Sequence, residues 1–227
     1  AFAVATPTAA QASNLTCTKS STKVETCTGT DSDGAKFEIR MPANFNGTLY
    51  VYAHGIRPNV NLPAIPVVAP TGSVIDYSPE VAPSAVVATS LLKQGFALAG
   101  SGVRAQGWSL EEGTDAFLQV LTAAKDKYSK VNKVVAWGNS LGGLTAQAFA
   151  EQYSGAVDAV IPMCIADSAQ AEITMAGDFL WGLKTLFNPA IKGFGYSAGT
   201  TGYLEMLGDL GAVLTTLGAL KAAIAAN

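Results

Sequence analysis

Gly138-Asn139-Ser140-Leu141-Gly142 is the most informative stretch of this 227-residue chain. The apolar run Val131–Trp137 before it is typical of a buried strand, and Leu141–Tyr153 after it has the pattern of a helix. A serine on a sharp strand-to-helix turn takes a strained backbone conformation, which small neighbours two residues away permit. Its hydroxyl then lies at a helix N-terminus, where N–H groups favour negative charge. The pattern predicts that Ser140 is a nucleophile rather than part of a turn without chemistry.

Strands and helices alternate on both sides of this turn. The expected order is a helix containing Val86–Leu92, a strand Phe96–Gly100, a helix Thr114–Tyr128, the strand and helix around Ser140, and a strand Ala156–Met163. Such alternation predicts a mostly parallel sheet covered by helices, the α/β class. Glu111 and Glu112 before the second helix are interpreted as favourable first-turn charges.

Antiparallel strands are expected before this region. Lys36–Met41 and Thr48–Ala53 flank Asn46-Gly47, the strongest short hairpin signal. Asn14–Thr18 and Lys23–Thr28 are two further β-type stretches. A proline-rich segment follows His54-Gly55, and its rings favour an extended loop.

The three cysteines indicate whether the protein folds in an oxidising compartment. Cys17 and Cys27 lie in the two short N-terminal stretches, so we expect a disulfide in an oxidising compartment, with two unpaired thiols as the alternative. Cys164 is the odd cysteine, either a buried small side chain or the partner of a cysteine outside this chain. Asn14 and Asn46 match glycosylation sequons, which also occur by chance.

We expect three segments along the chain. Residues 1–13 resemble the small-residue end of a processed secretory signal or a disordered segment, residues 14–167 form the core, and residues 168–227 form a helical lid or cap. In the last segment, apolar residues at steps of three and four form a stripe: Leu204, Leu207, Leu210, Leu214, Leu217, Leu220 and Ile224. An ordinary helix packed on the core fits this stripe equally well.

Composition narrows the function classes. The chain is 49% hydrophobic and 14% charged, as in a globular protein, and its net charge of -3 comes without charged blocks. Nucleic acids and anionic membranes are therefore not expected partners. No uninterrupted apolar run reaches the length of a transmembrane segment, so a secreted, soluble protein is expected. One histidine and three scattered cysteines lack metal-ligand spacing, so neither a metal nor another cofactor is expected.

Residues 36–167 resemble the α/β-hydrolase superfamily of esterases, lipases and related serine hydrolases. The resemblance is carried by the strand, the G-x-S-x-G turn and the helix around Ser140, and by an upstream strand that ends in His54-Gly55. It implies that the N–H of Leu141 and an N–H near Ile56 form the oxyanion hole. Gly55, Gly138, Asn139 and Gly142 would shape this site.

The family's general base is a histidine that follows the serine in the chain, held by a carboxylate. His54 is the only histidine and lies upstream, where the resemblance implies a structural role or a role in shaping the oxyanion loop. Asp167 lies where some members carry the acid, but Asp167-Ser168-Ala169-Gln170 has capping-box spacing and a helix cap is the preferred interpretation. The chain is thus expected to contain half of an active site. A cleaved C-terminal part or a separate subunit would supply the last strands, the acid and the histidine.

The sequence therefore predicts a serine hydrolase that cleaves carboxylic esters, with small-molecule or lipid-like substrates. A peptidase or amidase of the same fold is one alternative, because nucleophile and oxyanion hole do not distinguish the leaving groups. A binding protein that keeps the fold without catalysis is the other.

Overall fold

A computed structural model describes residues 15–64, 71–165 and 168–226 of the chain. The chain divides into two compact units. We call them the core unit, up to Arg57 and from Asp76 to Ala166, and the helical unit, Pro58–Ile75 together with residues from Asp167 onward. The expected first segment, residues 1–13, lies outside the described residues.

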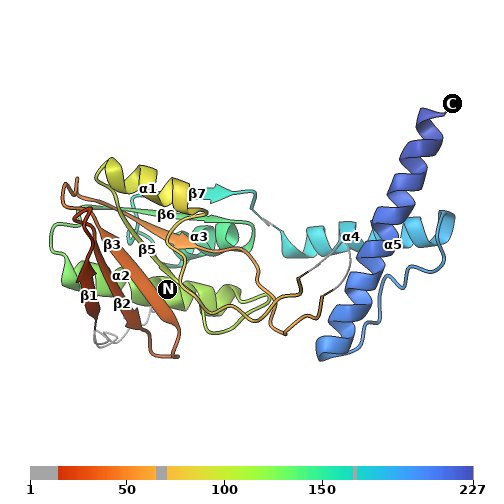
Figure 1. Cartoon of the computed structure of the whole chain (residues 1–227), viewed down its shortest axis with the longest axis horizontal. Helices are drawn as coiled ribbons and strands as arrows, with labels where there is room; N and C mark the ends of the chain where they lie inside the picture. Colours follow the sequence, from red (N-terminus) through yellow and green to blue (C-terminus); the bar gives the residue numbers. More distant parts are fainter. Residues whose placement is uncertain (1–14, 65–70, 166–167, 227) are drawn as a thin grey trace, which may run out of the picture. The chain divides into compact units, whose positions relative to one another are not determined.

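The core unit is built on a seven-stranded sheet in the order β1-β2-β3-β5-β4-β6-β7 (Figure 1). Pairing is antiparallel from β1 to β3 and between β3 and β5, and parallel from β5 through β4 and β6 to β7. The strands are β1 Thr16–Lys19, β2 Glu25–Thr30, β3 Lys36–Met41, β4 Thr48–Ala53, β5 Ala97–Ser101, β6 Lys133–Asn139 and β7 Ala159–Met163. The predicted fold class, an α/β fold with a mostly parallel sheet and an N-terminal antiparallel region, is confirmed.

The hairpin predicted around Asn46-Gly47 is wrong. Gly47 does adopt a positive φ of 95°, but β5 lies between β3 and β4 and pairs with both. All five residues of β5 are buried, and a strand buried on both faces takes a central position with two neighbours. The Asn46 N–H bonds instead to the Gly95 carbonyl at 2.9 Å, just before β5. The dipeptide forms a turn, but long-range pairing decides which strand lies next to β3.

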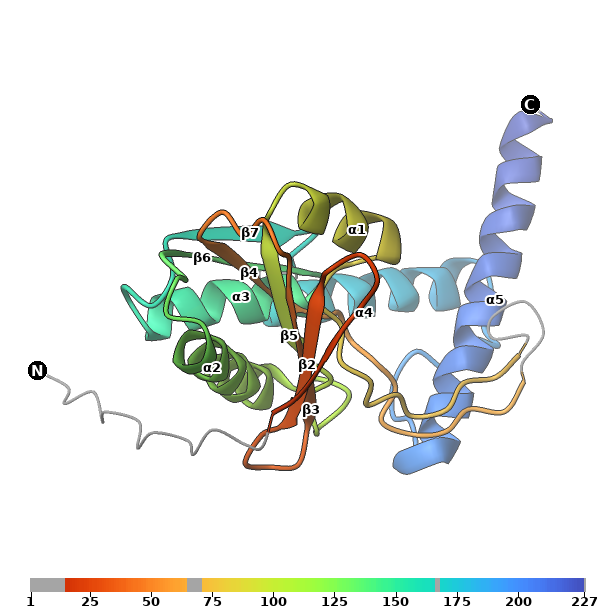
Figure 2. The same ribbon diagram turned by 60° about the vertical axis from the view of Figure 1, so that its left-hand side comes forward.

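Helices cover both faces of the sheet (Figure 2). Helices α2, Leu110–Lys127, and α3, Leu141–Gln152, bury Val120 and Phe149 with residues of β2 to β6. Helix α1, Ala85–Lys93, packs on the opposite side with Leu98 and Trp137. Helix α2 begins four residues earlier than Thr114, so that Glu111 and Glu112 occupy its first turn as expected. The layers place the C-terminal ends of β4 and β6 beside the start of α3.

The N-terminal disulfide is present. Cys17 and Cys27 lie opposite each other in the β1–β2 register and are bonded. Cys164 is free and exposed, so the prediction of a buried side chain is wrong. The side chain of Asn46 bonds to Gln94 and Thr48, whereas Asn14 lies outside the described residues.

The helical unit contains α4, Ala169–Leu186, and α5, Gly199–Ala225. The leucine stripe of α5 does not face a core, because most of its members are exposed: Leu204, Leu210, Leu214, Leu217 and Ile224. The residues that α5 buries are Gly202, Asp209, Val213 and Thr216. By length and composition alone α5 also reaches the dimensions of a membrane span, with a mean hydropathy of 1.4. The absence of a transmembrane segment and the role as a lid therefore stay predictions.

Candidate active site

Ser140 occupies the sharp turn that the sequence predicts, between the end of β6 at Asn139 and the start of α3 at Leu141. Its φ of 54° and ψ of -125° place a residue with a side chain in a region that normally favours glycine. Such a conformation costs about 1–3 kcal/mol and persists only where the surroundings impose it. The backbone N–H of Ser140 is held at 2.9 Å from the carbonyl of Met163 at the end of β7.

Gly138 and Gly142 permit this turn because backbone atoms occupy the space that a Cβ would need. A Cβ at Gly138 would lie 2.2 Å from the carbonyl oxygen of Gly142. A Cβ at Gly142 would lie 2.0 Å from the carbonyl oxygen of Ala53 and 2.5 Å from that of His54. The two glycines therefore let β4, β6 and α3 approach one another at Ser140.

The hydroxyl of Ser140 differs from those of two other serines at helix starts. Ser84 and Ser168 cap α1 and α4, since their Oγ atoms accept hydrogen bonds from Val87 and Ala171 at 3.3 Å. Ser140 precedes α3 in the same way, but its side chain makes no capping bond. Within the part of the chain that the structure describes, no hydrogen bond engages this hydroxyl. It is available to react with a ligand.

Backbone N–H groups point out of the first turn of α3 near this hydroxyl. The first intrahelical donor is Gly143, whose N–H lies 2.9 Å from the Ser140 carbonyl, so the N–H groups of Leu141 and Gly142 precede it. Leu141 itself is buried at 4% exposure, which fixes its backbone. The predicted donor Leu141 is therefore at a position where an N–H and the helix dipole can stabilise an oxyanion.

The His54-Gly55 turn lies against Ser140. A Cβ at Gly55 would be 3.5 Å from the Cβ of Ser140 and 3.4 Å from the carbonyl oxygen of Asn139. The absence of a side chain at Gly55 thus allows the loop after β4 to approach the serine. Ile56, the second predicted oxyanion donor, follows immediately, and its side chain is 54% exposed.

His54 is not arranged as the base of Ser140. It is buried, and its Nδ1 lies 2.7 Å from the Gly55 carbonyl, so Nδ1 carries the proton in the neutral ring and donates. Its Nε2 is buried without a hydrogen-bond partner among the described residues. Burial lowers the pKa of His54, which keeps the ring neutral. His54 lines a cavity of about 20 Å³ with Ser109, which has room for one water molecule.

Tyr52 is a site residue that the sequence analysis missed. Its buried hydroxyl donates a hydrogen bond to the side-chain oxygen of Asn139, the residue before Ser140. Burial raises the pKa of Tyr52 to about 12, so this donor stays protonated at neutral pH. Tyr52 lies on β4 and its partner Asn139 is 87 residues away in the sequence, so no local pattern indicated this contact.

Asp167, the remaining predicted site residue, lies outside the described residues. The N-cap of α4 is Ser168 rather than Asp167, because the hydroxyl of Ser168 is the group that accepts from Ala171. Across residues 15–64, 71–165 and 168–226, no group of three or more His, Cys, Asp or Glu side chains could hold a metal ion.

Comparison with known proteins agrees with the fold described above. A sequence model of the α/β-hydrolase fold matches residues 77–197, more than half of the chain. No curated protein matches. Among solved structures, an esterase from Aspergillus oryzae superposes with a TM-score of 0.50 and 16% identity, over 70% of this chain and 31% of the esterase. This likeness shows the fold alone.

Two further solved structures are similar to a smaller degree. An esterase from Pyrococcus furiosus has a TM-score of 0.48 and 14% identity over 83% of this chain and 64% of that protein. Acetyl xylan esterase 1 from Thermoanaerobacterium has a TM-score of 0.44 and 15% identity, over 78% of this chain and 62% of that protein. The chain therefore spans less than two thirds of each of these three structures.

Proposed function

Because the chain belongs to the α/β-hydrolase fold family, we propose that it carries the nucleophile and oxyanion hole of a secreted serine hydrolase that cleaves carboxylic esters. The observation that carries the proposal is the conformation of Ser140: a strained serine at a helix start whose hydroxyl caps nothing. Strain of this kind is retained where a reactive group must be presented. The capping serines Ser84 and Ser168 lack both properties.

In the proposed reaction, the Oγ of Ser140 attacks the carbonyl carbon of the ester while a base accepts its proton. The carbonyl oxygen becomes an oxyanion, which accepts hydrogen bonds from the N–H groups of Leu141 and Ile56. Collapse of the tetrahedral intermediate breaks the bond to the alcohol oxygen, which takes the proton from the base. Water then attacks the acyl-enzyme in the same way and releases the acid.

The base and its acid belong to residues outside this chain in our proposal. The chain has one histidine, and the hydrogen bond and burial of His54 hold it in the loop after β4. A cleaved C-terminal part of the same precursor or a second subunit would supply the missing histidine and carboxylate. This proposal explains why the chain has the nucleophile turn at Ser140 but no histidine placed to accept its proton.

The open edge of β7 gives this second polypeptide a place to pair, but only a short one. β7 has five residues, and among the described residues it pairs with β6 alone, so no described strand occupies its other edge. The backbone carbonyl of Met163 faces β6, where it accepts the N–H of Ser140. Backbone groups of adjacent strand residues point in opposite directions, so the backbone nitrogen of Pro162 faces the outer edge of β7. Proline lacks an N–H and is typical of edge strands. The missing proton acceptor is therefore a stronger argument for the second polypeptide than the edge itself.

Labelling with a fluorophosphonate probe tests the nucleophile. In the protein purified with every polypeptide that accompanies it, we expect covalent labelling at Ser140 and hydrolysis of a p-nitrophenyl ester. S140A should abolish labelling and lower kcat by at least about 10³-fold. The matched control is S84A, which removes a serine hydroxyl at another helix start; it should keep activity and cost about 1 kcal/mol of stability.

The outcomes separate the alternatives. Failure to label Ser140 in the assembled protein would contradict catalysis and favour a binding protein of the same fold. Faster cleavage of a peptide anilide than of the ester would favour the peptidase or amidase. Intact-mass analysis of the native protein should reveal a second polypeptide, and an active lone chain of these 227 residues would contradict that part of the proposal.

A further inference from the structure

We propose that Arg57 is a positioning residue that holds the oxyanion loop, His54–Arg57, in the geometry that reaction at Ser140 requires. This inference rests on the proposed function, because it concerns the loop that carries the second oxyanion donor. Arg57 does not touch the reacting atoms in this proposal and acts through the backbone N–H of Ile56.

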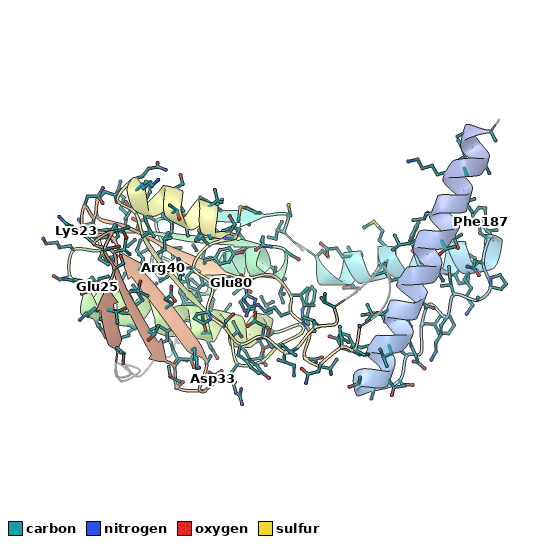
Figure 3. All side chains as sticks on the ribbon, viewed as in Figure 1. Lys23, Glu25, Asp33, Arg40, Glu80 and Phe187 are labelled. Carbon is teal, nitrogen blue, oxygen red and sulfur yellow. A yellow bond between two sulfur atoms is a disulfide. The ribbon has the colours of Figure 1, made fainter. Side chains whose placement is uncertain are left out.

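The guanidinium of Arg57 is largely buried and is held by two hydrogen bonds and an ion pair. Its side chain is 10% exposed, and Nη1 donates to the carbonyl oxygens of Asp76 and Ser78, both at 2.9 Å. Nη2 lies 2.7 Å from the Oε1 of Glu80, which Figure 3 labels on the core unit. One side chain thus fastens the oxyanion loop to three positions of the segment 76–80.

The segment 76–80 is itself fixed to the sheet. A Cβ at Gly100 would lie 1.8 Å from the carbonyl oxygen of Glu80, and one at Gly102 would lie 2.1 Å from that of Tyr77. The backbone of the segment therefore packs directly on the end of β5. Arg104 adds a contact, with its guanidinium carbon 5.0 Å from the centre of the Tyr77 ring. Because Arg57 contacts this segment, the segment can hold the oxyanion loop in place.

The side chain of Ile56 does not hold the backbone N–H of this residue in place. Its side chain is 54% exposed, so packing does not fix it. On one side, Gly55 lies against Ser140. On the other, Arg57 is held by its side chain and by its carbonyl oxygen, which accepts the N–H of Gly107 at 2.9 Å. The orientation of the Ile56 N–H is thus set by its two neighbours.

The planar fork of arginine suits this task, because it donates to two carbonyl oxygens while its charge pairs with a carboxylate. The ammonium of lysine provides one compact charge on a flexible chain and cannot reproduce this set. A displacement of about 1 Å at a catalytic group can cost about 100-fold in rate. Loss of the Arg57 contacts should therefore affect kcat more than substrate binding.

The test compares R57K and R57M with R40M in the assembled protein. Arg40, labelled in Figure 3, pairs with Glu38 on β3, so R40M removes an arginine–glutamate pair outside the oxyanion loop. With a p-nitrophenyl ester, we expect kcat to fall about 100-fold in R57M and about 10-fold in R57K, with KM within about threefold of wild type. R40M should stay within about twofold. Ser140 should still be labelled in every variant, only more slowly in the Arg57 variants.

Amide hydrogen exchange supplies a readout that needs no activity. The Ile56 N–H should exchange faster in R57K and R57M than in wild type, whereas the amides of β6 should keep their protection. Should R57M fail to fold, R57K decides. An active wild type with unchanged kcat and unchanged Ile56 exchange in R57K would overturn the role of Arg57 and leave the proposed function intact. A wild type that is never labelled at Ser140 would overturn both.

Discussion

The core unit and the helical unit use apolar side chains in opposite ways. In the core unit, large apolar residues such as Phe149 and Leu98 are completely buried between the sheet and its helices. In the helical unit, the leucine stripe of α5 is largely exposed, and its buried face includes Asp209 and Thr216. Apolar periodicity therefore identifies a helix, but the face that the helix buries depends on the groups opposite it.

Hydrogen bonds explain the inverted face of α5. The carboxylate of Asp209 accepts the N–H groups of Lys192 and Gly193 and the hydroxyl of Tyr196, at 2.6 to 2.8 Å. Thr216 lies 3.0 Å from the side-chain nitrogen of Asn188 in the same connection. Donors of the α4–α5 connection would lose these acceptors if the leucines turned inward, and a buried unpaired donor costs about 1–3 kcal/mol. Polar contacts therefore orient this helix.

The largest expected contrast concerns glycines. In G142A, the new Cβ would meet the carbonyl oxygens of Ala53 and His54 at 2.0 and 2.5 Å, so we expect a loss of more than about 4 kcal/mol in the free energy of unfolding. In α5, a Cβ at Gly211 meets nothing within 4 Å, so G211A should add about 0.5–1 kcal/mol. Chemical denaturation measures both. A G142A variant as stable as wild type would contradict the tight packing at Gly142.

Truncation of apolar side chains should also affect the stability of the two units differently, with smaller losses than the glycine substitution. F149A removes a ring that is 0% exposed and contacts Phe117 at 4.5 Å between centroids, which should cost about 3–5 kcal/mol. L214A removes a side chain that is 47% exposed and should change stability by no more than about 0.5 kcal/mol. Thermal and urea unfolding of the two variants provide the values. A loss of several kcal/mol in L214A would show that the exposed stripe is covered in solution.

The smallest expected effects concern pH, because Asp31 in the core unit and Asp209 in the helical unit should change stability with opposite sign. In the core unit, burial and the neighbouring Asp33 raise the pKa of Asp31 from 3.8 to about 7. In the helical unit, burial raises the pKa of Asp209, but the bonds from Gly193, Tyr196 and Lys192 outweigh it and the net pKa lies below 3.8. The stability from Asp31 is present below pH 3.8 and is lost as the pH rises through 7; that from Asp209 is lost as the pH falls below 3.8.

D31N and D209N measure these two contributions. D31N should be more stable than wild type at pH 8 by about 1 kcal/mol, because solvent screening reduces the effect of this half-exposed group, and equal to it at pH 3. D209N should be less stable than wild type at pH 7, and the difference should shrink below pH 4. Melting curves across this range, with Asp115 replaced as an exposed control, test the signs. Parallel pH profiles for the two variants would contradict the opposite roles.

Much of the site was predictable because its determinants are local. The spacing of Gly138 and Gly142 around Ser140, the strand before and the helix after were all predicted from neighbouring residues, and the structure contains them. Tyr52 and Arg57 were not recognised. Tyr52 acts on Asn139, 87 residues away, and Arg57 acts on segment 76–80, so their roles depend on pairings that no local pattern encodes.

The alternation of strands and helices and the sharp turn at Ser140 were predictable from the sequence, because backbone propensity, glycine spacing and apolar periodicity act between near neighbours. Long-range contacts, by contrast, place β5 between β3 and β4, bury Asp209 while most of the leucine stripe of α5 stays exposed, and bond Arg57 to segment 76–80. The physical reason is common to all three. Burial of a strand and pairing of a buried charge are satisfied by groups distant in the chain, and several partners compete until the chain has folded.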